Sequence, residues 1–545
     1  MANKVLERPR TSDASAPIPT AAAAAPALDQ PNYLSHQQIL VVLVGLLAGM
    51  LLAALDQSIV GTALPRIVSD LGGLDQLAWV VTGYLLTSTA TTPLWGKISD
   101  LYGRRKIFQL AIAIFLIGSA LCGLSQNMVQ LIGFRSLQGI GGGGLMAIAF
   151  AIIGDIIPPR ERGRYQGYFG AVFGVSSVAG PLLGGWFTDG PGWRWIFYIN
   201  LPIGIAALVI TTLALRLPVV RREHRIDYLG AALIVGAVSS LLLYLNWTGI
   251  SYGWFAPASL ALLATSVVLS ALFVVVEHRA AEPIIPLRLF RNRVFTVGNI
   301  YGFLAGVAMF GAIVFLPLYL QAVRGMSPTL SGLAMVPMVI GIFTTSIGSG
   351  VLITRTGRYK IYPILGAAVL VVSLWLLGAL HLETPYWRLA ALMFAFGAGL
   401  GLTMQTITTA VQNAVEFRDL GTATSATTFF RSLGGALGAA IFGAVLSTRL
   451  TSHLATLMGD AHVAGGASIS ANNVEGIQAL PEPIKSLVLN AFTLAIDDVF
   501  RAGIPFVLLA LIVAFFLEEL TLRTGGPADA APGEAASVEA LAAGV

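Results

Sequence analysis

The sequence has little charge and almost no cysteine, and these shortages exclude several classes of protein. Asp, Glu, Lys and Arg make up only 11% of its 545 residues, whereas hydrophobic residues make up 56%. An ordinary soluble domain carries about 25% charged residues. Cys122 is the only cysteine, so no disulfide can form within the chain. The composition therefore indicates an integral membrane protein without a disulfide framework.

Recognisable enzyme chemistry is missing as well. The sequence contains no Gly-x4-Gly-Lys-Ser/Thr phosphate-binding loop, which argues against ATP hydrolysis. Its six histidines are scattered through tails and loops without the spacing of metal ligands. We therefore predict that the protein is not an enzyme and holds no cofactor or metal. Any work that the protein does would therefore have to draw on a concentration gradient and not on ATP.

Long apolar runs are what the sequence has in abundance. Runs of 18 or more residues recur along the chain, and each could cross a hydrocarbon layer of roughly 30 Å as a helix. Strands of a membrane barrel would be about ten residues long and would alternate in polarity, so a barrel is excluded. We predict an all-α integral membrane protein with fourteen transmembrane helices, at about residues 39–62, 76–95, 107–125, 130–153, 165–187, 194–215, 228–247, 256–276, 294–320, 330–353, 361–380, 387–411, 421–446 and 500–520.

The positive charges between these runs predict the orientation. If the N-terminus is cytoplasmic, the short cytoplasmic loops hold 19 Lys or Arg residues and the short outer loops hold four. Under the positive-inside rule, this ratio places both termini in the cytoplasm and supports an even number of spans. A twelve-span count is the weaker alternative, because it would break the alternation of charge.

A repeated loop indicates that the chain consists of two related halves. The segment 96–106 returns 254 positions later as 350–360, with glycine at the first and eighth positions, arginine at the ninth and lysine at the eleventh. Many transporters are built from such repeats. The predicted parts are a disordered cytoplasmic tail (1–38), a six-helix bundle (39–215), a linker with two inserted helices (216–293), a second six-helix bundle (294–520) with an outer loop (448–499) that could contain an amphipathic interfacial helix, and a disordered cytoplasmic tail (521–545).

Three ionisable residues lie deep within apolar spans: Asp56, Arg135 and Arg431. Each costs about 2.5–3.5 kcal/mol on insertion scales, so each is a functional candidate. Asp56 is the only carboxylate predicted at such depth, which makes it the candidate proton carrier. The structural alternative is a permanent ion pair between Asp56 and Arg135. Arg431 could bind an anionic substrate group, or it could hold Glu416 or backbone carbonyls.

Five segments, in order, resemble the major facilitator superfamily and, within it, the fourteen-span drug:proton antiporter family. They are 55–65, 96–106, 133–144, 170–185 and 193–204, and the resemblance extends over roughly residues 39–520. It implies that Asp56 and Arg135 form a proton-coupling pair. It also implies a latch on the cytoplasmic side, made of Gly96, Asp100, Gly103, Arg104 and Arg105. The antiporter helix would use Gly170, Gly174, Gly180, Pro181, Gly184 and Gly185 for close helix contact and a kink.

The resemblance implies a proton-coupled antiporter that exports hydrophobic or amphipathic small molecules, such as drugs, dyes and antibiotics, across the cytoplasmic membrane by alternating access. We expect a monomer that embeds in the bilayer and binds no nucleic acid. Because the C-terminal spans carry Arg431 and no acidic residue, dicationic substrates are in doubt. The alternatives are a dedicated exporter of one metabolite or lipid, and a membrane sensor or assembly protein that does not transport. Weaker candidates for the substrate cavity are Gln57, Ser58, Trp79, Gln138, Tyr301, Gln321, Trp375, Gln405 and Arg431.

Overall fold

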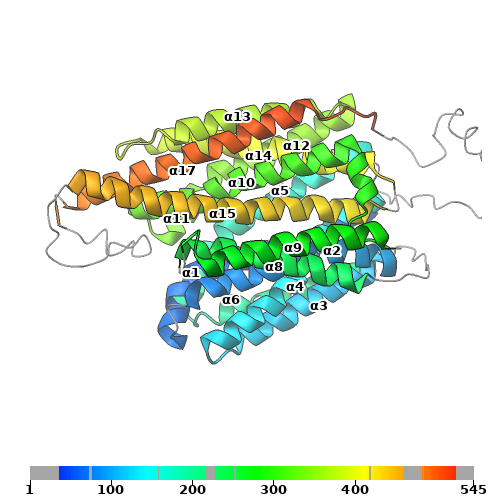
Figure 1. The fold of residues 1–545 in the computed structure, drawn as a ribbon, viewed down its shortest axis with the longest axis horizontal. Helices are drawn as coiled ribbons and strands as arrows, with labels where there is room; N and C mark the ends of the chain where they lie inside the picture. The colour runs from blue at the N-terminus through cyan, green and yellow to red at the C-terminus, as the bar shows by residue number, and fades with distance from the viewer. Residues whose placement is uncertain are drawn as a thin grey trace, which may run out of the picture. The chain divides into compact units, whose positions relative to one another are not determined.

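The structure is a computed structural model, and its described part is built from α-helices joined by short connections (Figure 1). The predicted tails lie outside the described residues, except for a few residues at their inner ends. The first helix thus begins at His36. The structure describes residues 36–72, 76–157, 159–215, 227–250, 253–280, 282–416, 419–458, 481–482 and 484–522.

Helices occupy each of the fourteen predicted spans. Among the described residues, eleven helices are long and apolar enough to cross a membrane, and the count of fourteen crossings stays a prediction. The first half consists of α1 (His36–Leu71), α2 (Leu77–Tyr102), α3 (Arg104–Gly123), α4 (Met128–Ile156), α5 (Pro159–Asp189), α6 (Trp195–Tyr198) and α7 (Asn200–Ala214). The inserted pair is α8 (Tyr228–Ile250) and α9 (Pro257–Arg279). The second half consists of α10 (Arg293–Leu318), α11 (Pro328–Ala334), α12 (Val336–Thr356), α13 (Ile361–Leu377), α14 (Tyr386–Ala414), α15 (Leu420–Met458) and α17 (Ile484–Phe515).

Helix α4 is the central element of the first half. The Asn127 side chain caps its start by accepting a hydrogen bond of 2.9 Å from the backbone of Gln130. Its glycine run lets the neighbouring helices approach closely, since a Cβ at Gly141 would meet the backbone of α3 and one at Gly143 would meet the backbone of α2. Most of α4 is consequently buried, and it can hold a polar group away from lipid.

The buried apolar residues group by half. Two clusters consist of residues between 39 and 215, and a third consists of residues between 234 and 522 together with Ala90 of α2. Ile234, Val238 and Leu242 of the inserted α8 belong to the third cluster. The apolar face of α8 therefore packs with the second half, while the exact domain boundaries stay predictions.

Helices α15 and α17 both extend into the predicted outer loop 448–499. The part expected to be an interfacial helix is the start of α17, where Phe492 and Ile496 are fully buried. The polar residues that suggested a loop are paired between the two helices, since Asp498 contacts His453 at 3.0 Å. The prediction of one long loop is wrong for the described residues at both of its ends.

Candidate functional site

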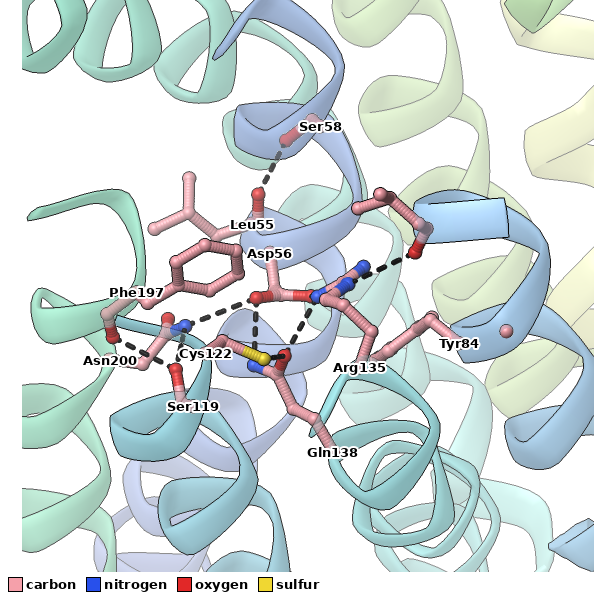
Figure 2. Close-up of polar contacts among 12 residues, drawn as sticks. Leu55, Asp56, Ser58, Tyr84, Ser119, Cys122, Arg135, Gln138, Phe197 and Asn200 are labelled. Carbon is pink, nitrogen blue, oxygen red and sulfur yellow. Dashed lines mark hydrogen bonds and ion pairs between the residues drawn. The ribbon is translucent and has the colours of Figure 1, made fainter. Parts of the chain in front are cut away.

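The deepest polar contact of the first half joins Asp56 of α1 to Arg135 of α4 (Figure 2). The two side chains are 0% and 1% exposed. One guanidinium nitrogen, Nη1, donates to Asp56 Oδ2, and Nε donates to the carbonyl oxygen of Val80 at 3.3 Å. A buried ion pair persists only when its remaining polar atoms also find partners.

Two amides complete the surroundings of the carboxylate. Gln138 Nε2 donates to Asp56 Oδ1 at 2.8 Å, while its Oε1 accepts from Arg135 at 2.8 Å. Asn200 Nδ2 donates to the same Oδ1 at 3.2 Å and to Ser119 Oγ at 3.0 Å. The carboxylate thus accepts hydrogen bonds from one guanidinium and two amides. Four helices, α1, α3, α4 and α7, meet at this cluster (Figure 2).

Aromatic rings and one unsatisfied atom border the pair. The Arg135 guanidinium carbon lies 4.4 Å from the centre of the Tyr84 ring and 5.9 Å from that of Phe197, so rings shield the cation. Asn200 Oδ1 is buried, and none of the described residues forms a hydrogen bond with it. Rings and hydrogen-bond donors thus enclose the ion pair on several sides.

The pair is connected to α5 through α1. Gly180 and Gly184 of α5 lie so close to α1 that a Cβ would collide with Ser58 and Thr62. Ser58 Oγ also donates to the carbonyl oxygen of Ser176 at 2.8 Å. The glycines of this motif therefore bring α5 against the helix that carries the carboxylate.

The opposite side of α5 faces the second half. A Cβ at Gly174 would collide with Val339 of α12, whereas one at Gly185 would lie 3.6 Å from Thr329 Oγ1. Gly170 lies in the same helix, but its surroundings are outside the described part. Pro181 is accommodated inside α5 without ending it. This helix thus contacts both halves at glycine positions that the sequence pattern singles out.

Residues of the predicted latch contact both halves at the predicted cytoplasmic side. Asp100 at the end of α2 is paired with Arg104, and Arg104 Nε donates to Asp155 Oδ2 at 2.6 Å. In the second half, both the backbone nitrogen and Oγ1 of Thr422 donate to Asp100 Oδ2 at 2.9 Å. The carboxylate therefore holds the first turn of α15.

The other latch residues have different positions. Gly103 joins α2 to α3 with a φ of 94°, a conformation that favours glycine. Gly96 allows α2 to approach α15, since a Cβ there would meet Ser425. Arg105 is half-buried. Asp155 and Thr422 contact the predicted latch residues, and the sequence motif did not include either of them.

A narrow pocket, with about 20 Å³ open to a water-sized molecule, lies in the second half between α10, α14 and α15. Arg431 and Tyr301 line it, as the sequence predicts for the cavity. The other lining residues are mostly small or apolar. They are Gly302, Ala305, Gly306, Met309, Leu400, Thr403, Met404, Ile407 and Thr427.

Comparison with known proteins identifies the family. The family model described as Major Facilitator Superfamily matches residues 46–439. The chain belongs to the major facilitator superfamily. The chain is 38% identical over 503 residues to the multidrug transporter protein MdtP of Bacillus subtilis strain 168, and the match covers 88% of this chain and 93% of MdtP. It is 37% identical over 492 residues to multidrug resistance protein 3 of the same strain, covering 89% and 96%.

Two further likenesses agree with this assignment. The MFS-type transporter Rv1877 of Mycobacterium tuberculosis strain H37Rv is 41% identical over 485 residues, covering 88% of this facilitator and 70% of Rv1877. The solved structure of the proton:xylose symporter XylE has the same fold, with a TM-score of 0.59, 14% identity and coverage of 90% and 98%. The facilitator is therefore a multi-pass membrane protein and a transporter, and its relatives include efflux pumps.

The remaining candidates for the substrate cavity differ in their exposure and in their hydrogen bonds. Gln138 belongs to the cluster around Asp56, and Trp375 is 65% exposed on α13. Gln321 donates to Ser331 Oγ at 3.1 Å. Gln405 is buried, Trp79 is half-buried and Gln57 is exposed. Asn200 is a further candidate that the sequence analysis missed, because an amide in an apolar run does not by itself indicate a contact with Asp56.

Proposed function

We propose that this transporter is a proton-coupled antiporter that exports hydrophobic or amphipathic small molecules from the cytoplasm. The observation that carries the proposal is the Asp56–Arg135 pair, a fully buried carboxylate held by one cation and two amides. Ionisable groups at such depth in membrane proteins mark ion pathways and proton relays. The multidrug transporters among the relatives support the substrate class.

The contacts of Asp56 suggest how one proton changes the structure. The ionised carboxylate draws together α1, α4 and α7 through its three donors. Protonation removes the negative half of the ion pair and turns one oxygen from acceptor into donor, so the contact between Asp56 and Arg135 weakens while the other oxygen still accepts from the amides. Because α1 is in close contact with α5, and α5 with α12, a shift of α1 reaches the second half.

The direction of the cycle follows from the gradient. A proton taken up from outside neutralises Asp56 and allows the return to the inward-facing state, where its release restores the ion pair and substrate binding. The latch at Asp100 must open before the transporter can reach the inward-facing state. Each charge that moves across the membrane contributes about 2.3 kcal/mol per 100 mV, so a single proton can drive accumulation.

The test measures proton movement and substrate movement together. Purified protein in liposomes that contain a pH-sensitive dye is given a pH gradient, and export of a monocationic fluorescent dye is followed in parallel. We expect wild type to couple the two fluxes and Asp56→Asn to abolish both gradient-driven dye movement and dye-dependent proton flux. Asp70→Asn is the matched control, because Asp70 lies on the same helix but is 39% exposed and pairs with Arg66 at 3.8 Å.

Two outcomes contradict the proposal. Coupled fluxes in Asp56→Asn at wild-type rates would make Asp56 a structural residue. Dye movement by wild type without proton flux would leave an exporter driven by another gradient. If wild type moves no compound of a chemically diverse panel, the dedicated exporter of one metabolite or lipid replaces the multidrug reading.

A further inference from the structure

Arg431 of α15 is a cation in a membrane helix, and the described residues give it no counter-charge. Among the residues that the structure describes, no hydrogen bond or ion pair engages its guanidinium, whose recorded contact is the Phe150 ring with a centroid distance of 5.8 Å. Of the described residues that line the pocket beside it, none carries a carboxylate. A cation in such surroundings is expensive unless something compensates it.

The hydroxyl groups of the pocket already donate hydrogen bonds to backbone carbonyls. The Tyr301 hydroxyl donates to the carbonyl oxygen of Pro363 at 3.0 Å. The hydroxyls of Thr403 and Thr427 each donate at 2.9 Å to a backbone carbonyl about one turn earlier in their own helix. None of these three groups supplies a negative charge, so the protein itself leaves Arg431 uncompensated within the described pocket.

The rest of the pocket suits an apolar body. Of the described residues outside its own helix turn, none comes within 4 Å of the place where a Cβ of Gly302 would stand, and Gly306 lies directly against the backbone of Arg431. Met309 and Met404 add flexible apolar walls that adapt to different shapes. The space open to a water-sized molecule is about 20 Å³ in this structure, so an apolar body can enter only when the surrounding helices move apart.

We propose that this pocket binds compounds that carry a single negative charge at one end of a hydrophobic body, with the Arg431 guanidinium pairing with the anionic group. The inference rests on the proposed function, because it names a substrate class for the exporter. A guanidinium offers a planar fork of donors that matches a carboxylate or sulfonate. The apolar wall accepts the body of the same molecule.

The test compares probes that share one body and differ in their head group. Pyrenebutanoate, pyrenebutanol and pyrenebutyl-trimethylammonium are titrated against the full chain in nanodiscs, with empty nanodiscs subtracted. We expect wild type to bind the anion about 10- to 100-fold more tightly than the alcohol. Arg431→Gln should erase this preference without changing the affinity for the alcohol, and Arg431→Lys should retain part of it. Arg449→Gln, which alters a 58% exposed arginine of the same helix, should bind like wild type.

A second variant keeps the arginine and blocks the site. Thr427→Asp places a carboxylate four residues before Arg431 in the helix, where the two can pair. We expect this variant to lose the preference for the anion while still binding the alcohol, even if Arg431→Gln should fail to fold. An anion preference that survives both variants, or that is absent from wild type, would overturn the proposal and leave Arg431 with a structural role.

Failure of this inference can be distinguished from failure of the proposed function. If wild type exports the alcohol with coupled proton flux but does not prefer the anion, only the assignment of the Arg431 pocket is overturned. If the anion preference depends on Arg431 but no proton flux accompanies export, the pocket assignment is supported and proton coupling is overturned.

Discussion

The two halves of this transporter treat their deep arginines in opposite ways. Arg135 in the first half is paired with Asp56, shares Gln138 with it, and lies over an aromatic ring. Arg431 in the second half borders a pocket, and in the described part of the chain no carboxylate or hydrogen-bond acceptor engages it. A compensated charge can serve as an internal switch, whereas an uncompensated one is suited to meet a charge that arrives from outside the protein.

The two copies of the repeated loop differ in a similar way, because the carboxylate of the first copy that contacts the other half has an uncharged counterpart in the second. Asp100 of the first copy, which holds the first turn of α15, corresponds to Thr354 in the second copy. The glycine that turns the chain is kept in both, with a φ of 94° at Gly103 and 70° at Gly357. The second copy therefore retains the geometry of the loop and lacks the charge that links the halves.

The comparison of the two arginines predicts the largest difference in stability. Arg135→Met leaves Asp56 buried without its counter-charge, and we expect the free energy of unfolding to fall by about 3–5 kcal/mol. Arg431→Met removes a charge that lacks a partner among the described residues, so we expect a neutral or stabilising effect. Unfolding in mixed micelles can be followed by labelling Cys122, which is the only cysteine and is buried.

Equal losses in the two methionine variants would contradict this contrast. They would show that Arg431 has a compensating interaction as strong as that of Arg135. Met suits both positions because it is unbranched and apolar, so it introduces no new polar group.

The charged residues of the site could be predicted from the sequence, whereas the polar residues that form hydrogen bonds with them could not. Asp56 and Arg135 are conspicuous because each interrupts an apolar run, and the structure brings them into contact. The amides and hydroxyls around them are common in membrane helices, and nothing local distinguishes Asn200 from a residue that merely contacts a neighbouring helix. Its contact with Asp56 depends on the packing of two helices 144 residues apart in the chain.

Fold prediction succeeded for the helices and failed at their outer ends. Apolar length marks a span, so helices occupy all the predicted ranges. The polar residues of 448–458 and 484–499 instead suggested a connection to water. Those residues continue α15 and α17, because charges such as Asp498 and Arg449 find partners on the adjacent helix. A pair formed between two helices cannot be recognised from the polarity of one segment.

The repeated loop predicts a second, smaller contrast. Asp100→Asn removes the charge that accepts two hydrogen bonds from Thr422, and we expect the closed latch to lose about 1.5–3 kcal/mol relative to the open state. Double electron–electron resonance measures the distance between spin labels at Tyr102 and Arg358 in a Cys122→Ala background. Asp100→Asn should show a larger population of long distances than the protein with Asp100 intact.

The matched control uses the other copy of the loop. Thr354→Val should leave the distances as in the wild type, since Thr354 Oγ1 donates at 2.9 Å to the carbonyl of Gly350 within its own helix. If Asp100→Asn and Thr354→Val gave the same distribution, the carboxylate would not be what keeps this side closed.

Two adjacent glycines of α5 predict the smallest contrast, because one faces the first half and the other faces the second. An added methyl at Gly184 would collide with α1 at Thr62, and we expect overpacking to reduce stability by about 1–3 kcal/mol and to slow proton-coupled export. At Gly185 the methyl would meet Thr329 Oγ1 at an ordinary 3.6 Å, so Gly185→Ala should instead gain about 0.5–1 kcal/mol from helix formation. Thermal unfolding and the coupled-flux assay measure both variants. If Gly184→Ala exported like wild type, close contact between α1 and α5 would not be needed to transmit the protonation of Asp56, and the second half would have to sense it by another route.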